Sequence, residues 1–187
     1  LRFYDRSEIK DLLAYLRLVV NPVDPVALER VINKPTRGIG ATTFAKIEAR
    51  AKDGRTSLWE SLCAEAISAP GATGGKLAGF VALMTDLQEL ARNGTALEVA
   101  RAVLDKTGYL DWIQKDGSVE GESRADNVRE LIDAIAEFAE RKADQSLGAW
   151  LDEIALTSNM DEEGDGQAVV LLTAQGFVFP APTGIVD

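Results

Sequence analysis

Apolar side chains recur at helical spacing along most of this chain, and that spacing limits the fold more than any other feature. The first stripe, Ile9, Leu12, Leu13, Leu16 and Val20, follows the i, i+3, i+4, i+7 pattern of a helix with one face in a core. We therefore expect a mainly α-helical domain. Further helices are expected over residues 76–92 and 124–142, and from starts near Asp24, Thr42, Ser57, Thr95 and Ser146.

Several of these helices carry recognisable start signals. In a capping box, the N-cap side chain and a Glu side chain three residues later each bind a free backbone N–H at the start of the helix. Asp24 before Pro25 is typical of an N-cap followed by a first-turn proline. Thr42 or Thr43 is expected to cap the helix that carries Phe44 and Ile47. Capping boxes are expected at Asp5–Glu8, Ser57–Glu60 and Thr95–Glu98.

The C-terminal part shows a different pattern. The acidic, glycine-containing stretch Asp161–Gly166 predicts an exposed loop, and the apolar, β-branched run Ala168–Thr173 predicts a short strand. A single strand needs a partner for its backbone hydrogen bonds. That partner would be the run Phe177–Phe179 or a strand outside this chain.

Residue usage excludes several classes of site. The 187 residues include no histidine and one cysteine, Cys63, so histidine-dependent triads and cysteine-rich zinc or disulfide frameworks are excluded, and we expect no catalytic residue and no metal site. No apolar run approaches the roughly 20 residues of a membrane span, and no basic and apolar leader opens the chain, so we expect a cytoplasmic protein. Because the chain begins at Leu1 within a helical pattern, we expect it to be part of a longer protein.

The formal net charge of −10 combines two regions of opposite sign. Residues 30–55 carry seven basic and two acidic side chains, a sum of +5, whereas residues 111–165 carry sixteen acidic and five basic ones, a sum of −11. A basic cluster can bind phosphates and an acidic half can dock a partner protein, but exposed helices also carry such clusters without binding anything. The charge pattern by itself leaves both interpretations open.

The segment 33–43, Asn-Lys-Pro-Thr-Arg-Gly-Ile-Gly-Ala-Thr-Thr, is the most informative candidate site. Its two glycines permit positive φ and leave the backbone without Cβ, so N–H groups can approach a phosphate oxygen, and the next helix start adds free N–H groups. This arrangement is typical of a helix-hairpin-helix that holds the DNA backbone, with Arg37 as the leading contact. A plain helix hairpin without DNA binding also uses glycine. The candidate DNA-binding residues are Lys34, Thr36, Arg37, Gly38, Ile39, Gly40, Thr42 and Lys46.

A second glycine-rich stretch, Gly71–Leu77, resembles a phosphate-binding loop only superficially. Such a loop requires a glycine where this chain has Pro70, and a Ser or Thr for Mg²⁺ where it has Leu77. We interpret the stretch as a flexible loop before a helix. Acidic pairs such as Asp152 with Glu153 are interpreted as solvated surface.

Four stretches, in matching order and spacing, resemble the UvrD/Rep/PcrA type of superfamily 1 DNA helicases. Phe3–Asp11 is similar to the FxRxEIKD motif of that family, and Glu29–Gly40 is similar to its ERxxNxPxRGIG hairpin. Glu122–Leu131 resembles the ESRxENxxEL helix, and the region from Leu151 to Thr173 resembles the approach to the strand of motif V. Together the four matches cover nearly the whole chain.

The resemblance implies a division into three parts. Residues 1–21 would be the edge of the second RecA-like motor half (2A), residues 22–166 its helical insertion (2B), and residues 167–187 a strand that returns toward 2A. In this family ATP, with Mg²⁺ implied, binds between the motor halves, the motor moves 3′ to 5′ along single-stranded DNA, and 2B contacts the duplex or duplex/single-strand junction. The whole protein would then be an ATP-dependent helicase of DNA repair or replication, in which this chain contacts the rest of the motor.

The chain also departs from the family pattern. It has no Gly-Lys-Thr phosphate-binding loop, no DExx motif and no QNYRS-like segment, so we do not expect it to hydrolyse ATP alone. After Thr173 the family has His and then Lys-Gly-Leu-Glu-Phe, where this chain reads Ala-Gln-Gly-Phe-Val-Phe-Pro. We therefore expect a duplex-contacting subdomain. The alternative is a helical protein-interaction or regulatory module without DNA binding.

Overall fold

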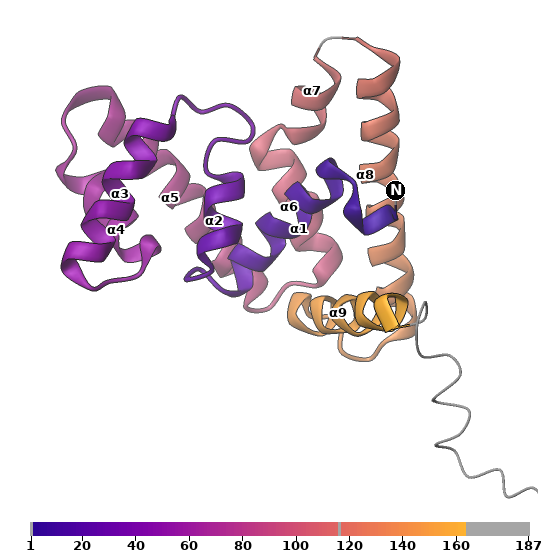
Figure 1. The fold of residues 1–187 in the computed structure, drawn as a ribbon. Coiled ribbons are helices and arrows are strands. Elements are labelled where there is room, and N and C mark those ends of the chain that lie inside the picture. Colours follow the sequence, from indigo (N-terminus) through magenta and orange to yellow (C-terminus); the bar gives the residue numbers. More distant parts are fainter. Residues whose placement is uncertain (1, 116, 164–187) are drawn as a thin grey trace, which may run out of the picture. The chain divides into compact units, whose positions relative to one another are not determined.

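The structure is a computed structural model that describes residues 2–115 and 117–163, with side chains described as far as residue 156. Within those residues every regular element is helical, which confirms the predicted mainly α class (Figure 1). A short 3₁₀ turn, η1 (Phe3–Asp5), comes first. The helices are α1 (Ser7–Val20), α2 (Pro25–Val31), α3 (Ala41–Gly54), α4 (Leu58–Ser68), α5 (Gly71–Ala91), α6 (Ala96–Thr107), α7 (Tyr109–Gln114), α8 (Val119–Arg141) and α9 (Leu147–Glu163).

Helix α1 is the central element of the compact unit Leu1–Leu151 and packs against α2, α5, α6 and α8. Ten of its 14 residues are buried, more than a single apolar stripe would bury. Because neighbours enclose α1 on several sides, the polar side chains of Glu8 and Asp11 are buried with the apolar ones. The predicted domain boundary after residue 21 falls between α1 and α2, inside this unit, and stays a prediction.

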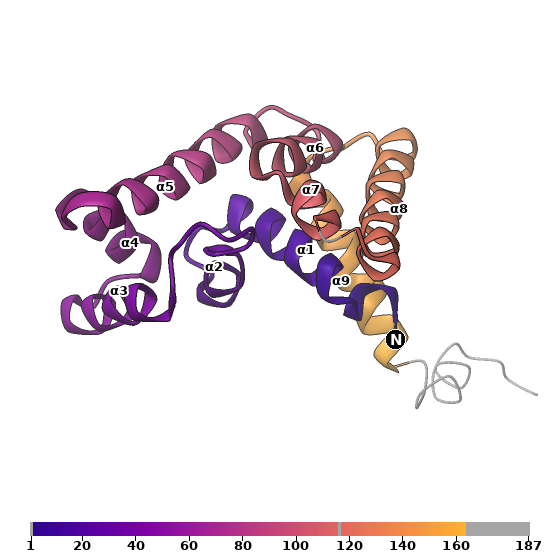
Figure 2. The same cartoon turned by 90° about the horizontal axis from the view of Figure 1, so that it is seen from above.

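Helices α3 and α4 pack on each other, and α4 packs in turn on α5. Helix α5 has 21 residues, and in Figure 2 it runs from the neighbourhood of α4 to that of α6. Its buried face carries Leu77, Phe80, Met84 and Leu87. This long helix therefore links the α3–α4 pair to the helices around α1, which it also contacts.

Four of the predicted helix starts are confirmed. Helix α9 begins at Leu147, directly after the predicted Ser146, whose Oγ accepts a hydrogen bond of 3.3 Å from the backbone N–H of Ala149. Ser57–Glu60 and Thr95–Glu98 form complete capping boxes at the starts of α4 and α6. At α2, Asp24 Oδ1 accepts hydrogen bonds of 3.0 Å from the backbone N–H groups of Val26 and Ala27. These local signals were sufficient because a cap depends only on residues within one helical turn.

Two other predicted starts are wrong. Helix α1 begins at Ser7 because residues 3–5 close a 3₁₀ turn that removes Asp5 from the N-cap position. Helix α3 has Gly40 as its N-cap, with no side-chain cap bond, so Thr42 and Thr43 lie inside its first turn.

The interpretation of Gly71–Leu77 as a flexible loop is also wrong, because this stretch forms the first turns of α5. A Cβ built on Gly74 would lie 2.4 Å from the carbonyl oxygen of Ala69, so the glycine lets the start of α5 approach the end of α4 closely. Similarly, α8 begins at Val119 rather than near residue 124, with Ser118 as its cap.

The C-terminal predictions fall only partly on described residues. Asp161–Glu163 form the end of α9 instead of an exposed loop. The predicted strand at 168–173, its partner run at 177–179 and the whole predicted segment 167–187 lie outside the described residues. Among the helices that the structure describes, none combines the length and apolar character needed to cross a membrane.

Candidate nucleic-acid interface

The predicted phosphate cradle lies in the connection between α2 and α3, residues 32–40, which we call the Gly38 turn. Helix α2 packs mainly on α1 and helix α3 on α4, so different neighbours hold the two ends of the turn. Gly38 has a φ of +71°, in the left-handed region that favours glycine. Gly40 has a φ of −86° and a ψ of 178°, an extended conformation open to any residue. The backbone conformation therefore requires only the first glycine.

The Gly38 turn is anchored by one apolar side chain. Ile39 is only 3% exposed and belongs to the core, whereas Thr36, Gly38 and Gly40 are exposed. The side chain of Ile39 therefore fixes the turn on the protein while the backbone on either side of it faces solvent.

The side chain of Asn33 occupies two of the backbone N–H groups in the predicted phosphate cradle. Its Oδ1 accepts hydrogen bonds from the backbone N–H of Arg37 at 2.8 Å and of Ile39 at 3.2 Å. Within the described part of the chain, the backbone N–H groups of Gly38 and Gly40 have no such acceptor. A phosphate would therefore meet the N–H groups of the two glycines rather than that of Ile39.

The guanidinium of Arg37 lies against the protein. Its Nη2 donates to the Tyr15 hydroxyl at 2.6 Å, and its Cζ lies 5.3 Å from the centre of the Phe80 ring, a cation–π distance. Arg37 thus ties the turn to α1 and α5. Its role as a phosphate contact stays a prediction, one that this position does not favour. Its Nη1 lies 3.0 to 3.5 Å from the carbonyl oxygens of Val31, Ile32, Lys34 and Pro35.

Tyr15 completes this arrangement from α1. Its hydroxyl accepts from Arg37 and donates to the carbonyl oxygen of Lys34. Burial raises the pKa of Tyr15 from 10.0 to about 12, although the neighbouring Arg37 charge acts in the opposite direction. The neutral phenol is therefore the form that holds the turn.

Lys34 is held by a buried carboxylate on α1. Asp11, which is 4% exposed, has its Oδ1 3.0 Å from Lys34 Nζ and 2.7 Å from Arg30 Nε. The Tyr109 hydroxyl donates to Asp11 Oδ2 at 2.9 Å, and burial together with this carboxylate raises the pKa of Tyr109. A buried carboxylate needs such partners. Lys34 is therefore already paired with a carboxylate of the protein.

The other basic residues between 30 and 55 divide into two groups. Arg50 lies on the surface with its Nη1 3.2 Å from Glu65 Oε2. Lys46, Lys52 and Arg55 are exposed, and the described residues provide no ion-pair partner for them. Of the predicted site residues, Thr42 and Lys46 are both exposed and lie four positions apart on α3, so they share a face of the helix.

Lys76 belongs to this site although the sequence pattern gave no sign of it. A Cβ built on Gly38 would lie 2.6 Å from Lys76 Nζ, so the lysine side chain lies directly beside the turn. Lys76 is part of the glycine-rich stretch that looked like a loop. Lys76 and Phe80 are four residues apart on α5, but the contact between Phe80 and Arg37 exists only in the folded chain, so the sequence offered no signal for Lys76.

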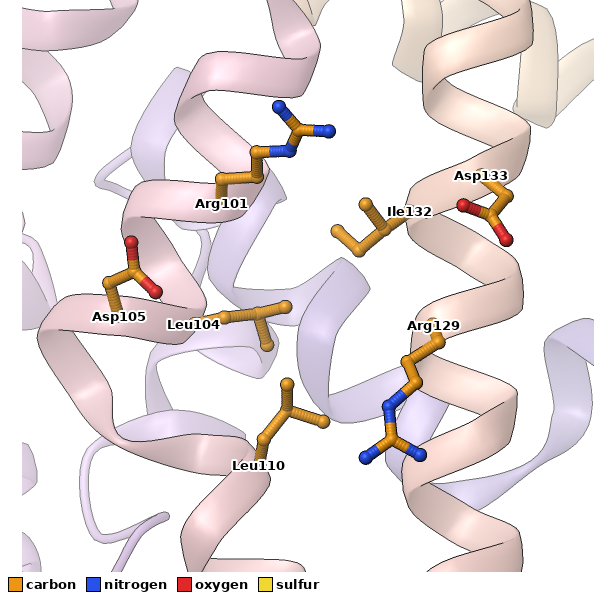
Figure 3. A pocket seen from close by; sticks show the side chains of 7 residues that line it. All are labelled: Arg101, Leu104, Asp105, Leu110, Arg129, Ile132 and Asp133. Atoms are coloured by element: carbon orange, nitrogen blue, oxygen red, sulfur yellow. The ribbon is translucent and has the colours of Figure 1, made fainter.

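A separate pocket of about 430 Å³ lies between α6, α7 and α8 (Figure 3). Its rim carries charges of both signs, and one of them, Arg129, already has its Nη1 2.6 Å from Asp126 Oδ1. Among the described residues there is no group of side chains that could hold a metal ion. This pocket therefore offers no preference for an anion or a cation. Its lining residues are Arg101, Leu104, Asp105, Leu110, Arg129, Ile132 and Asp133.

Comparison with known proteins identifies relatives of the whole chain. Residues 1–67 match the family model of the UvrD-like helicase C-terminal domain. The ATP-dependent DNA helicase PcrA of Bacillus subtilis strain 168 is 33% identical over 190 residues, which cover 96% of this chain and 26% of the relative. PcrA of Staphylococcus epidermidis RP62A is 33% identical over 187 residues, which cover 96% of this chain and 25% of the relative.

PcrA of Staphylococcus aureus Mu50 is 31% identical over 185 residues, again with 96% of this chain and 25% of the relative covered. The chain thus spans about a quarter of the length of the curated relatives it matches. These matches confirm the family resemblance drawn from the four motifs and identify the chain as a fragment of a UvrD/PcrA-type superfamily 1 helicase.

Proposed function

We propose that this chain is the duplex-contacting subdomain of an ATP-dependent 3′ to 5′ DNA helicase, and that the Gly38 turn and the start of α3 hold the DNA backbone. Residues 22–166 would form the 2B insertion, with 1–21 and 167–187 in 2A. ATP and Mg²⁺ would be bound by motor elements whose motifs this sequence does not contain. The relatives named PcrA support the helicase, and the geometry of the turn supports the contact.

The exposed backbone at Gly38 is the observation that carries the proposal. A left-handed glycine with an available N–H lies two residues before the N-cap of α3. The first N–H groups of a helix and its partial positive charge favour an anion there. Lys46 adds a positive charge one turn beyond Thr42, and both residues are exposed.

These groups can bind phosphate oxygens but present no planar pair of donors and acceptors to a base edge. Binding through N–H groups, a hydroxyl and an ammonium group fixes position on the backbone without reading sequence. We therefore expect similar affinity for duplexes of unrelated sequence and a strong dependence of affinity on salt.

The test is a fluorescence anisotropy titration of the chain with a short labelled duplex at several salt concentrations. Lys46→Ala should weaken binding and lower the slope of log affinity against log salt by about 0.9, the value for one lost phosphate contact. Lys106→Ala removes the same charge from α6, where Lys106 Nζ lies 3.1 Å from Asp86 Oδ2, and serves as the matched control. A wild-type chain that binds no duplex even at low salt would contradict the proposal.

The acidic face of α8 supports a second function, as a docking surface for a basic protein partner. Glu130, Asp133 and Glu137 are all exposed at successive helical spacings. This surface can coexist with DNA binding, because it lies on a different helix from the Gly38 turn. Capture of a Lys-rich peptide, lost when these three residues are changed to Gln and Asn, would support it, and equal capture by both proteins would contradict it.

A further inference from the structure

We propose that Lys76 on α5 is a second DNA-backbone contact of the Gly38 turn, and that it binds the phosphate group whose approach Gly38 permits. This inference rests on the proposed function, since it assigns a further residue to the same interface. It adds a residue 38 positions away in the sequence and on a different helix.

The side chain of Lys76 follows the surface of Gly38. A Cβ on Gly38 would lie 2.6 Å from Nζ, 3.1 Å from Cε and 3.5 Å from Cδ of the lysine. The missing Cβ therefore makes room for the ammonium group as well as for the left-handed φ. The Lys76 ammonium group therefore lies beside the exposed backbone of Gly38, where a phosphate held by the Gly38 N–H would meet it.

The charge of Lys76 is available for a ligand. The side chain is exposed, and the part of the chain that the structure describes gives it no ion pair or hydrogen bond. Lys34 and Arg37, the charges that the sequence pattern favoured, are instead held at Asp11 and Tyr15. A lysine ammonium is a compact charge with three donors on a flexible stem, and it binds phosphate without a fixed orientation.

Helix α5 carries both Lys76 and Phe80, the residue that supports the turn through Arg37. Lys76 and Phe80 are four residues apart, so they lie on the same face of the helix. Phe80 contacts the Arg37 guanidinium, and Lys76 lies beside Gly38, the next residue along the turn. This face of α5 therefore does two things at once: Phe80 and Arg37 position the turn, and Lys76 supplies charge to its exposed side.

The experiment compares Lys76→Ala, Lys76→Arg and the charge-matched control Lys106→Ala in the same duplex titration. We expect Lys76→Ala to lower the salt slope by about 0.9 and to weaken binding, while Lys76→Arg keeps the wild-type slope. The thermal midpoint of Lys76→Ala should equal that of the wild type within the error of a circular dichroism melt, because an exposed side chain without partners contributes little to stability.

The outcomes separate the two proposals. If Lys46→Ala lowers the slope and Lys76→Ala does not, the interface stands and the role of Lys76 is wrong. If Lys76→Ala and Lys106→Ala lower the slope equally, the effect is one of net charge and the Lys76 contact is overturned. If the wild-type chain binds no duplex at any salt concentration, the proposed function fails together with the contact.

Discussion

Arg37 Nη2 donates a 2.6 Å hydrogen bond to the hydroxyl of Tyr15 and so joins the Gly38 turn to the middle of α1. The same guanidinium and the same hydroxyl both donate to the carbonyl oxygen of Lys34. Through Nη1, Arg37 also donates to the carbonyl oxygen of Val31, the last residue of α2. Carbonyl groups at the end of a helix lack intrahelical partners, so Arg37 acts as a cap for α2.

Arg37→Ala should therefore destabilise the fold. The substitution removes the Arg37 donor from the partly buried carbonyl oxygens of Ile32 and Pro35 and from the Tyr15 hydroxyl, and one such loss costs about 2 kcal/mol of unfolding free energy. Urea unfolding followed by circular dichroism measures the change. Lys46→Ala, which removes a charge from an exposed site, should change stability by less than about 0.5 kcal/mol. An equal and small effect of both substitutions would contradict the structural role of Arg37.

Arg37→Ala also tests whether Arg37 only positions the Gly38 turn or contacts a phosphate directly. If Arg37 only holds the turn, Arg37→Ala should weaken duplex binding while the salt slope keeps its wild-type value, because no phosphate contact is lost. Arg37→Lys keeps the charge but not the planar set of donors, so it should show the same weakened binding. A slope lower by about 0.9 in Arg37→Ala would instead assign it a direct phosphate contact.

The raised pKa of Tyr15 predicts a loss of stability at high pH. Between the unfolded value of 10.0 and the folded value of about 12, the unfolded chain releases the phenol proton and the folded chain keeps it. The contribution of Tyr15 is therefore complete below about pH 10 and falls by about 1.4 kcal/mol per pH unit above it.

Tyr15→Phe removes this titration and provides the comparison. It should be less stable than the wild type at neutral pH, because Arg37 loses a hydrogen bond, but the difference should shrink as the pH rises toward about 12. Tyr109 is present in both proteins, so its own raised pKa does not affect the difference. Urea midpoints of both proteins across this range measure it, and a constant difference would contradict the assignment.

Local features of this fold could be predicted from the sequence. The helices with strong apolar stripes are present, and the capping boxes at Ser57 and Thr95 formed because their groups lie within one turn of each other. The start of α5 could not be predicted. Gly71 and its neighbours favour a loop by propensity, whereas in the structure they are helical and the missing Cβ of Gly74 leaves room for the carbonyl oxygen of Ala69.

The candidate site also has one part that could be predicted from the sequence and one part that could not. The Gly-Ile-Gly pattern, which concerns only the local backbone, predicted that both glycines could adopt positive φ, and only Gly38 does so. The partners of Arg37 and Lys34 could not be predicted from the sequence. Tyr15, Asp11 and Phe80 are distant in the sequence and meet the turn only after the helices have packed. A cluster of basic residues in a sequence therefore overstates the charge that remains free for DNA.

Asp11→Asn should lower the unfolding free energy by about 2 kcal/mol. The change keeps the shape of the side chain but removes the buried counter-charge of Arg30 and Lys34, whose side chains are 32% and 40% exposed and therefore limit the cost. Asp5→Asn is a suitable control, because Asp5 Oδ1 lies 3.0 Å from Lys10 Nζ in an exposed pair that contributes less than about 1 kcal/mol. Similar urea midpoints for the two variants would show that the Asp11 cluster does not stabilise the fold.

The two glycines of the turn should respond differently to alanine. Gly38→Ala places a side chain at a φ of +71° and against Lys76 Nζ, so it should cost about 1 to 2 kcal/mol of stability and also weaken duplex binding. At Gly40 the added Cβ meets nothing within 4 Å, and Gly40→Ala should cost less than about 1 kcal/mol through the poorer N-cap. The added methyl group would hinder the approach of a phosphate to this exposed backbone. Gly40→Ala should therefore weaken duplex binding while the fold is retained. Anisotropy and urea unfolding on both variants measure this separation, and wild-type affinity in Gly40→Ala would mean that DNA does not approach the backbone there.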